Sequence, residues 1–213
     1  MDCGREIEFK AGQYLEVISG DKRYPFSIAS SPDQSPTLEL HIKPTPNSSD
    51  SDQFEALLDS ASELNIVVPK GDCFLESCPD KPLLMLAAAT GVTQMKSITE
   101  HLIAGGLEHP TYLYWGVVSD QDLYMSSLCE KWAKQDQNFH YVPVVSEPAH
   151  SPNWKGRTGL VGEAALEDFE DVSNMSVIVG GSPGMVYATF DMFVAKGLPE
   201  VNAQSDVFSY APR

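Results

Sequence analysis

The sequence predicts two domains, an antiparallel β-barrel over residues 1–80 and an α/β domain with a parallel sheet over residues 81–213. Short runs of alternating apolar and polar residues, separated by turn-prone segments, fill the first third of the chain. From Lys81 onward, apolar runs typical of buried strands alternate with stretches of helical periodicity. The chain has 213 residues, of which 42% are hydrophobic, and this is enough to bury a core.

Three runs in the first domain have the length and alternation of strands in a small barrel. They are YLEVI (14–18), FSIAS (26–30) and LELHIK (38–43). The segments SGDKRYP and SSPDQSP supply the turns between them. A further strand, NIVVPKG, comes later, and its Pro69 and Gly71 mark a barrel edge or an exit turn.

A polar loop over residues 44–54 leads into the helix FEALLDSA. Asp50, Ser51 and Asp52 stand at its start, and side-chain oxygens of these residue types bond to the free amides of a first helical turn. We therefore expect these three residues to cap the helix.

The second domain alternates strand and helix, which is the pattern of a parallel sheet wound by helices. The expected strands are LLMLAAA (83–89), TYLYWGVV, FHYVPVVS and MSVIVGG. The expected helices are TQMKSITEHLIAGG, QDLYMSSLCEKWAKQ, GLVGEAALEDF and GMVYATFDMFVAKG.

Two strand-to-helix turns in this domain can line one crevice. One strand runs into Gly91 and a helix, and another runs into Gly180 and Gly181 before Pro183 and Gly184 open the last helix. Ligands of open α/β sheets bind at the carboxyl ends of the strands, where helix N-termini meet phosphate or nicotinamide. The glycine spacing satisfies neither G-x-G-x-x-G nor the P-loop pattern, so a plain strand-to-helix turn stays an alternative reading of Gly91 alone.

Composition excludes several classes of partner. A formal net charge of −16 argues against nucleic acid and anionic membranes, because both are bound by clustered Lys and Arg. No segment approaches the roughly 18 to 20 apolar residues of a membrane helix, and MDCGREIEFK lacks the apolar core of a secretory signal. Four sparse cysteines, Cys3, Cys73, Cys78 and Cys129, favour free thiols in a reducing compartment. We expect a cytoplasmic protein without a metal site, although Cys73 and Cys78 show the C-x4-C spacing that begins one iron–sulfur pattern.

Six segments stand in a fixed order along nearly the whole chain, from AGQYLEV (11–17) to SDVFSYAPR (205–213). They are YPFSIAS, LELHIK, ATGVTQM, YWGVVSDQDLY, WKGRTGLV and GGSPGMV. In this order they resemble the flavin reductases of the ferredoxin–NADP reductase superfamily, particularly the bacterial NAD(P)H-flavin reductases associated with luminescence. The resemblance implies a flavin-binding β-barrel followed by a Rossmann-like domain that binds NADH or NADPH.

The resemblance also implies hydride transfer from nicotinamide to N5 of FMN, FAD or riboflavin. Ser27 is the catalytic candidate, because the family's serine in YPFSIAS bonds to the flavin near N5 and a hydroxyl can both donate and accept. Holding the two rings together in a water-poor cleft then carries most of the catalysis. The implied flavin-binding residues are Tyr24, Pro25, Phe26, Ser27, His41, Ile42, Lys43, Phe208 and Tyr210. The implied nicotinamide-binding residues are Ala89, Thr90, Gly91, Val92, Thr93, Trp115, Gly180, Gly181, Ser182, Pro183 and Met185.

The flavin segment departs from the family pattern at one position. Tyr24 stands where relatives have an arginine that holds the flavin phosphate, and Arg23 lies one residue earlier. A slip of one residue in a strand turns a side chain to the other face. Either a bulge restores Arg23, or the phosphate is bound weakly, as suits a flavin that is released after each turnover.

Other departures leave the choice of nucleotide open. Ala89, Gln94 and Gly180 stand where many relatives have glycine, proline and cysteine. Val118 stands where some relatives have an arginine that can meet cofactor phosphates, so NADH and NADPH are not separated. Relatives also carry another strand before AGQYLEV. Either MDCGREIEF supplies this strand in altered form, or the strand is missing and the barrel has an exposed edge.

Three functional hypotheses follow. The first is a flavin reductase that supplies reduced flavin to a luciferase, a monooxygenase or ferric iron. The second is a reductase subunit that keeps its flavin and passes electrons to a separate oxygenase component. The third is a nucleotide-binding module without turnover, prompted by Tyr24, Ala89 and the short N-terminal segment.

Overall fold

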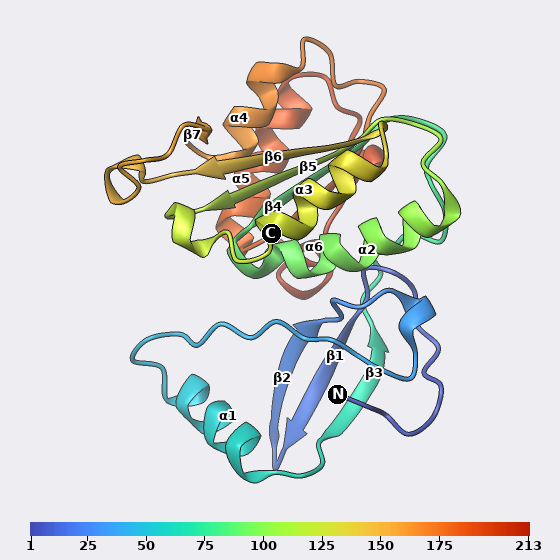
Figure 1. Ribbon diagram of the computed structural model, residues 1–213, viewed down its shortest axis with the longest axis vertical. Coiled ribbons are helices and arrows are strands. Elements are labelled where there is room, and N and C mark those ends of the chain that lie inside the picture. The colour runs from blue at the N-terminus through green and yellow to red at the C-terminus, as the bar shows by residue number, and fades with distance from the viewer.

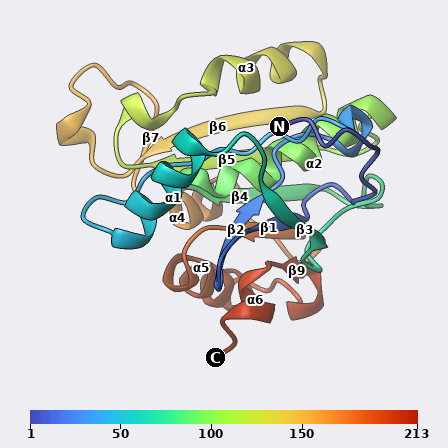
Figure 2. The same cartoon turned by 90° about the horizontal axis from the view of Figure 1, so that it is seen from below.

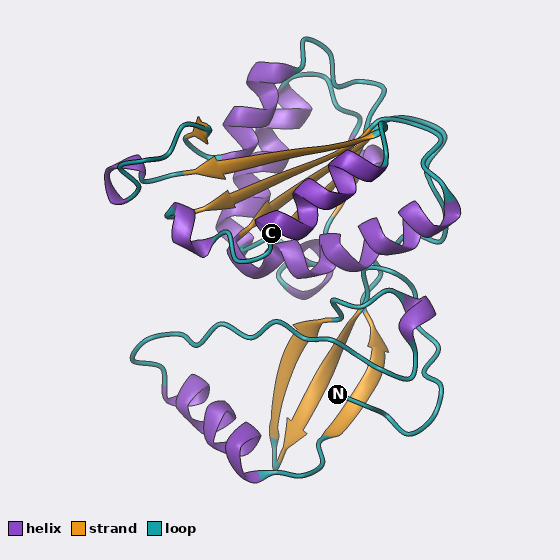
Figure 3. Ribbon diagram, in the orientation of Figure 1, coloured by secondary structure: helices purple, strands orange, loops and turns teal.

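Two sheets organise the chain, which the computed structural model describes over all 213 residues (Figure 1). The first is a three-stranded antiparallel sheet in the order β2-β1-β3, and the second is a six-stranded sheet in the order β7-β6-β5-β4-β8-β9. Figure 3 shows that most of the helices lie around the second sheet. The predicted order, an antiparallel β region followed by a parallel α/β region, is therefore confirmed. The segment 71–82 connects the two sheets.

The small sheet consists of β1 (Tyr14–Ser19), β2 (Lys22–Ser27) and β3 (Asn65–Lys70). A tight turn joins β1 to β2, and Gly20 adopts a φ of 58° there, which glycine tolerates without a steric penalty. The β1–β2 register runs without a shift from Tyr14 opposite Ser27 to Ser19 opposite Lys22. No bulge therefore moves Arg23 into the place of Tyr24.

The expected strand over residues 38–43 is wrong as a regular element, and β2 ends at Ser27 before the expected residue 30. The segment runs beside residues 28–30, with the Ala29 amide donating to the Glu39 carbonyl at 2.8 Å. The Glu39 amide, however, donates to the Ser30 hydroxyl at 3.2 Å instead of to a backbone carbonyl. A side chain thus takes a bond that a strand ladder would use, and the ladder ends. The preceding amide, that of Leu38, donates to the Met1 carbonyl at 2.8 Å.

Helix α1 (Ser49–Ser60) begins three residues before Asp52, and the predicted capping residues are wrong. The N-cap is Ser48, whose hydroxyl accepts from the Ser51 amide at 3.3 Å. Asp50 and Asp52 lie inside the first turn, where their negative charge is favourable beside the positive end of the helix dipole.

The second sheet is entirely parallel. Its strands are β4 (Leu83–Ala88), β5 (Thr111–Val117), β6 (Phe139–Val145), β7 (Arg157–Thr158), β8 (Ser176–Gly180) and β9 (Ala203–Gln204). The helices are α2 (Val92–Gly105), α3 (Ser126–Gln135), α4 (Val161–Asp168), α5 (Pro183–Ala195) and the short α6 (Val207–Tyr210). The strands and helices predicted for this region are present, whereas the two-residue strands β7 and β9 and the helix α6 were not predicted.

Both faces of this sheet are covered, as Figure 2 shows with α3 on one side and α5 on the other. Along β4, Met85 faces the cluster that contains α2 and α3, and its neighbours Leu84 and Leu86 face the cluster that contains α4 and α5. Successive strand residues point to opposite faces, so burial on both faces explains why β4 reads as a continuous apolar run. None of the helices combines the length and the apolar character that crossing a bilayer requires.

Candidate functional site

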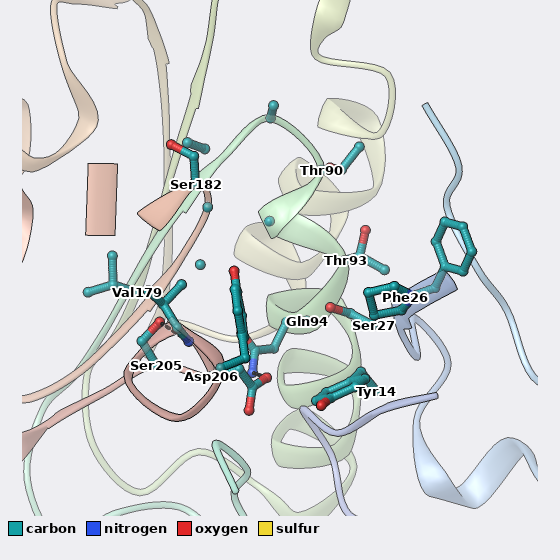
Figure 4. Close-up of a pocket in the computed structure, with 18 of the residues that line it drawn as sticks. Tyr14, Phe26, Ser27, Thr90, Thr93, Gln94, Val179, Ser182, Ser205 and Asp206 are labelled. Carbon is teal, nitrogen blue, oxygen red and sulfur yellow. Dashed lines mark hydrogen bonds between the residues drawn. The ribbon is translucent and has the colours of Figure 1, made fainter. Parts of the chain in front are cut away.

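A cavity of about 600 Å³ opens between the two sheets (Figure 4). One wall comes from β1, β2 and the segment around His41. The opposite wall comes from the β4–α2 turn, the β8–α5 turn and the segment 205–210 near the C-terminus. Twelve of the predicted site residues line it: Pro25, Phe26, Ser27, His41, Ala89, Thr90, Gly91, Thr93, Gly180, Gly181, Ser182 and Tyr210. The candidates for flavin and for nicotinamide therefore meet in one cavity.

The two strand-to-helix turns touch each other at the floor of this cavity. A Cβ added to Gly91 would overlap the carbonyl oxygen of Gly180, and one added to Gly180 would lie 3.0 Å from the carbonyl oxygen of Gly91. No side chain larger than hydrogen fits between the turns. The bare backbone is open to a close ligand and lies at the positive ends of α2 and α5, as a nucleotide requires.

Ala89 holds a backbone conformation that alanine rarely adopts, with a φ of 49°. The buried Trp115 donates from Nε1 to the Ala89 carbonyl at 2.9 Å and so supports this conformation from below. Trp115 is thus a support of the predicted nicotinamide turn and does not line the cavity.

Ser27 faces the cavity from the end of β2, with its hydroxyl directed toward the α2 side (Figure 4). No protein group bonds to this hydroxyl, so both its donor and its acceptor capacity are open to a ligand. Tyr14, its partner across the β1–β2 pair, stands beside it on the same wall.

Neither Arg23 nor Tyr24 is placed to hold a flavin phosphate. Arg23 Nη1 pairs with Glu16 Oε2 at 2.9 Å. The Tyr24 ring packs on the Phe54 ring, with 4.8 Å between centroids, and does not line the cavity. The walls of the 600 Å³ cavity carry the carboxylates of Glu16 and Asp206 and contain neither lysine nor arginine.

His41 joins the two halves of the molecule through a hydrogen-bonded chain. Its Nδ1 lies 2.7 Å from the Tyr124 hydroxyl, and its Nε2 lies 2.7 Å from Glu39 Oε1. The buried Lys96 of α2 donates to Glu39 Oε2 at 2.8 Å and is also bonded to Glu100. Burial opposes ionisation of Glu39, but the hydrogen bonds from Lys96 and His41 outweigh it, so the pKa of Glu39 lies below its ordinary value.

A second cavity of about 510 Å³ adjoins the first and shares His41, Ala89 and Thr90 with it. The predicted flavin residues Ile42 and Lys43 lie here. Lys43 Nζ pairs with Asp122 Oδ1 at 2.9 Å across the gap between the two sheets, so its charge is already matched.

Five further predicted residues also lie away from both cavities, together with Tyr24. These are Val92, Trp115, Pro183, Met185 and Phe208. Val92 is buried in the core, and the Phe208 ring packs against Tyr187 and Phe190. Pro183 and Met185 belong to the first turn of α5, where the Ser182 hydroxyl accepts from the Met185 amide at 3.5 Å.

Sequence reasoning missed a polar corner formed by Gln94 and Asp206. Asp206 Oδ1 accepts from the Cys73 amide at 3.2 Å, and its Oδ2 accepts from Gln94 Nε2 at 3.1 Å. Burial raises the pKa of Asp206 to about 6, against these bonds, which lower it. The signal in the sequence was Gln94 itself, an amide near the start of the expected helix, where many relatives have proline.

Comparison with known proteins agrees with this geometry. Residues 85–191, which include both glycine turns, match the family model described as the oxidoreductase NAD-binding domain. The NAD(P)H-flavin reductase of Vibrio harveyi is 37% identical over 194 residues, covering 88% of this chain and 81% of that protein. The probable flavin reductase of Photobacterium leiognathi is 34% identical over 208 residues, covering 96% and 88%.

Longer proteins also match. Protein RfbI of Salmonella typhimurium is 35% identical over 204 residues, but this chain spans only 60% of its length. The Amycolatopsis cytochrome P450 reductase GcoB superposes with a TM-score of 0.82 at 25% identity, covering 95% of this chain and 62% of that one. With the family model over half of the chain and two flavin reductases matched over most of their lengths, this chain belongs to the NAD(P)H-flavin reductases of the ferredoxin–NADP reductase superfamily.

Proposed function

We propose that the protein is an NAD(P)H:flavin oxidoreductase that takes FMN, FAD or riboflavin as a substrate and releases it reduced. The observation that carries the proposal is the single cavity in which Ser27 faces the paired turns at Gly91 and Gly180. In this proposal residues 1–80 hold the flavin and residues 81–213 hold the nicotinamide nucleotide. The flavin reductases among the relatives support it.

When both ligands are bound, nicotinamide supplies the hydride and flavin N5 accepts it. Ser27 offers a hydroxyl that can donate to N5 before hydride transfer and would accept from the N5–H that forms when N5 receives the hydride. The turns at Gly91 and Gly180 let the nucleotide lie directly against backbone, and α2 and α5 present their positive ends to its phosphates. The protein therefore contributes position and exclusion of water more than acid–base chemistry.

Weak retention of the flavin is part of the proposal. Arg23 is paired with Glu16, Lys43 is paired with Asp122, and Tyr24 lies on Phe54. No unpaired lysine or arginine on either cavity wall is therefore left for a flavin phosphate. The reduced flavin would then pass to an oxygenase, a luciferase or ferric iron in the cytoplasm, where the four free cysteines stay reduced.

The first test is oxidation of NADH and of NADPH with and without added flavin. Flavin-dependent turnover supports the proposal, the ratio of the two rates settles nucleotide choice, and absence of turnover would leave a non-catalytic binding module. We expect Ser27→Ala to lose roughly 2 to 4 kcal/mol of transition-state stabilisation, seen in kcat. Ser19→Ala, in the same small sheet but outside the cavity, serves as the control. An unchanged kcat in Ser27→Ala would remove the hydroxyl from the mechanism.

A second candidate is a reductase subunit that keeps its flavin. It is favoured by the cytochrome P450 reductase GcoB, of which this chain spans 62%, and by a ferredoxin reductase in carbazole 1,9a-dioxygenase, which shares the fold with a TM-score of 0.76. Gel filtration separates the candidates. A protein that emerges yellow, with flavin in equal molar amount, supports the retained-flavin candidate against the released-flavin one.

A further inference from the structure

Gln94 is a buried amide at the junction of three segments. It lies in the first turn of α2 and is only 4% exposed. Its Nε2 is 3.0 Å from the Gly12 carbonyl, 3.0 Å from the Cys73 carbonyl and 3.1 Å from Asp206 Oδ2. Three acceptors thus surround one amide nitrogen that has two hydrogens.

These partners fix the orientation of the amide. The carbonyls of Gly12 and Cys73 can only accept, so the NH2 group must face them and the carbonyl oxygen Oε1 must face the opposite way. On that side lies Gly180, where an added Cβ would be 3.5 Å from Oε1. All three hydrogen bonds of the side chain use Nε2 and none uses Oε1, and Gln94 forms part of the wall of the 600 Å³ cavity (Figure 4). A buried side chain therefore presents one unpartnered acceptor to the cavity.

The position of Oε1 selects the ligand that would donate to it. Gln94 lies in the helix that follows β4, and Gly180 is the last residue of β8. The turns after these two strands form the bare backbone floor, and both residues lie within the matched NAD-binding region. Ser27 and Tyr14, the residues next to the proposed flavin, lie on the opposite wall. On the nucleotide side, the donor that a nicotinamide ring carries is the NH2 of its carboxamide.

We propose that Gln94 Oε1 accepts a hydrogen bond from the nicotinamide carboxamide NH2 and thereby holds the ring in its orientation. The inference rests on the proposed function and adds a binding residue to it. Oε1 has no donor within the protein, and the carboxamide NH2 would supply one on binding.

A ligand analogue tests the bond without any mutation. In 3-acetylpyridine adenine dinucleotide the carboxamide NH2 is replaced by a methyl group, while the carbonyl is kept. We expect the wild-type protein to bind NAD+ about fivefold more tightly than this analogue, the factor that corresponds to one ordinary hydrogen bond. Dissociation constants come from quenching of tryptophan fluorescence, so the readout does not depend on turnover.

The variant Gln94→Met keeps the length of the side chain and removes both amide groups. We expect it to weaken NAD+ binding about fivefold and to bind the analogue as the wild type does, which abolishes the discrimination. Gln13→Met is the matched control. Gln13 is also buried, but its Oε1 accepts from the Lys10 amide and its Nε2 donates to the Gly71 carbonyl, so both ends are used within the protein. It should keep the wild-type ratio of dissociation constants.

The outcomes separate this inference from the proposed function. Equal wild-type affinity for NAD+ and the analogue overturns the inference, and so does a Gln94→Met variant that weakens both ligands equally, because that result indicates a structural role. An effect on flavin affinity alone also overturns it. If any of these results is obtained and the wild-type protein still oxidises NADH with added flavin, the proposed function stands and only the Gln94 bond is overturned. Absence of nucleotide binding in the wild type would overturn both.

Discussion

The two sheets differ most in the amount of core that supports them. The three-stranded sheet rests on six buried hydrophobic residues, among them Leu15, Val17 and Phe54. The six-stranded sheet is packed on both faces, with 19 buried residues in one cluster and 15 in the other. Regions with few buried apolar contacts open at lower free energy than regions with many. We therefore expect the six-stranded sheet to be the more rigid platform and the three-stranded sheet, on the proposed flavin side, to open at lower free energy.

Removal of a large side chain from the small core should have the largest effect. Phe54 is 3% exposed and contacts the rings of Tyr24 and Phe26, each with 4.8 Å between centroids. Phe54→Ala is expected to lower the free energy of unfolding by about 3 to 5 kcal/mol. Because the cluster contains only six residues, this loss should unfold the small sheet locally. Hydrogen exchange should rise in residues 14–27 while NAD+ binding persists.

Phe193→Ala is the matched variant on the other side. Phe193 is fully buried in α5, within the cluster of 15 residues, so the same volume is removed from a larger core. Here we expect one cooperative loss of stability that includes the nucleotide site. Equal increases of exchange in both sheets for both variants would contradict the difference between the two regions.

The paired turns allow a sharper perturbation of the rigid platform. A methyl group at position 91 would overlap the Gly180 carbonyl oxygen, and neither backbone can yield without moving its strand. Because misplacement of a reacting group by about 1 Å costs about 100-fold in rate, we expect Gly91→Ala to lower kcat/KM for the nucleotide by about 100-fold. Steady-state kinetics at varied nucleotide and fixed flavin measure this loss.

Gly105→Ala gives the control within the same helix. An added Cβ there has nothing within 4 Å, and alanine is the better helix former. It should leave kcat/KM unchanged and the protein slightly more stable. A Gly91→Ala variant with wild-type kinetics would show that the contact between the turns does not shape the site.

The same contrast explains what could be predicted from the sequence. The strands of the parallel sheet are buried on both faces and read as apolar runs, so β4 and β8 were predicted with the glycine turns that follow them. Residues 38–43 alternate like a strand, but the Ser30 hydroxyl takes the Glu39 amide, and alternation alone does not reveal such a bond. The polar corner was missed because Asp206 meets Cys73 across 133 residues of sequence, a contact that no local pattern encodes.

That polar corner gives the smallest predicted effect, and its sign can be worked out. Burial raises the pKa of Asp206 from 3.8 to about 6. Between these pH values the folded protein holds a proton that the unfolded chain has lost, so the stability from Asp206 is present at low pH and is lost as pH rises through about 6. The difference in free energy of unfolding between the wild type and Asp206→Asn should therefore change by about 2 kcal/mol from pH 4 to pH 7, with the wild type losing stability.

Taking the difference between the two proteins removes two other contributions. Any constant cost of the asparagine, whose NH2 must face a donor, cancels between the two pH values, and the contributions of the other carboxylates cancel between the two proteins. Asp171→Asn supplies a control of opposite sign, because the Ser173 amide and hydroxyl hold the pKa of Asp171 below its ordinary value and the wild type should gain stability as pH rises. Urea unfolding at pH 4, 5, 6 and 7 measures both differences. A flat difference for Asp206→Asn would mean that the carboxylate is ionised and well solvated, and the corner between the two sheets would then be wetter than its burial indicates.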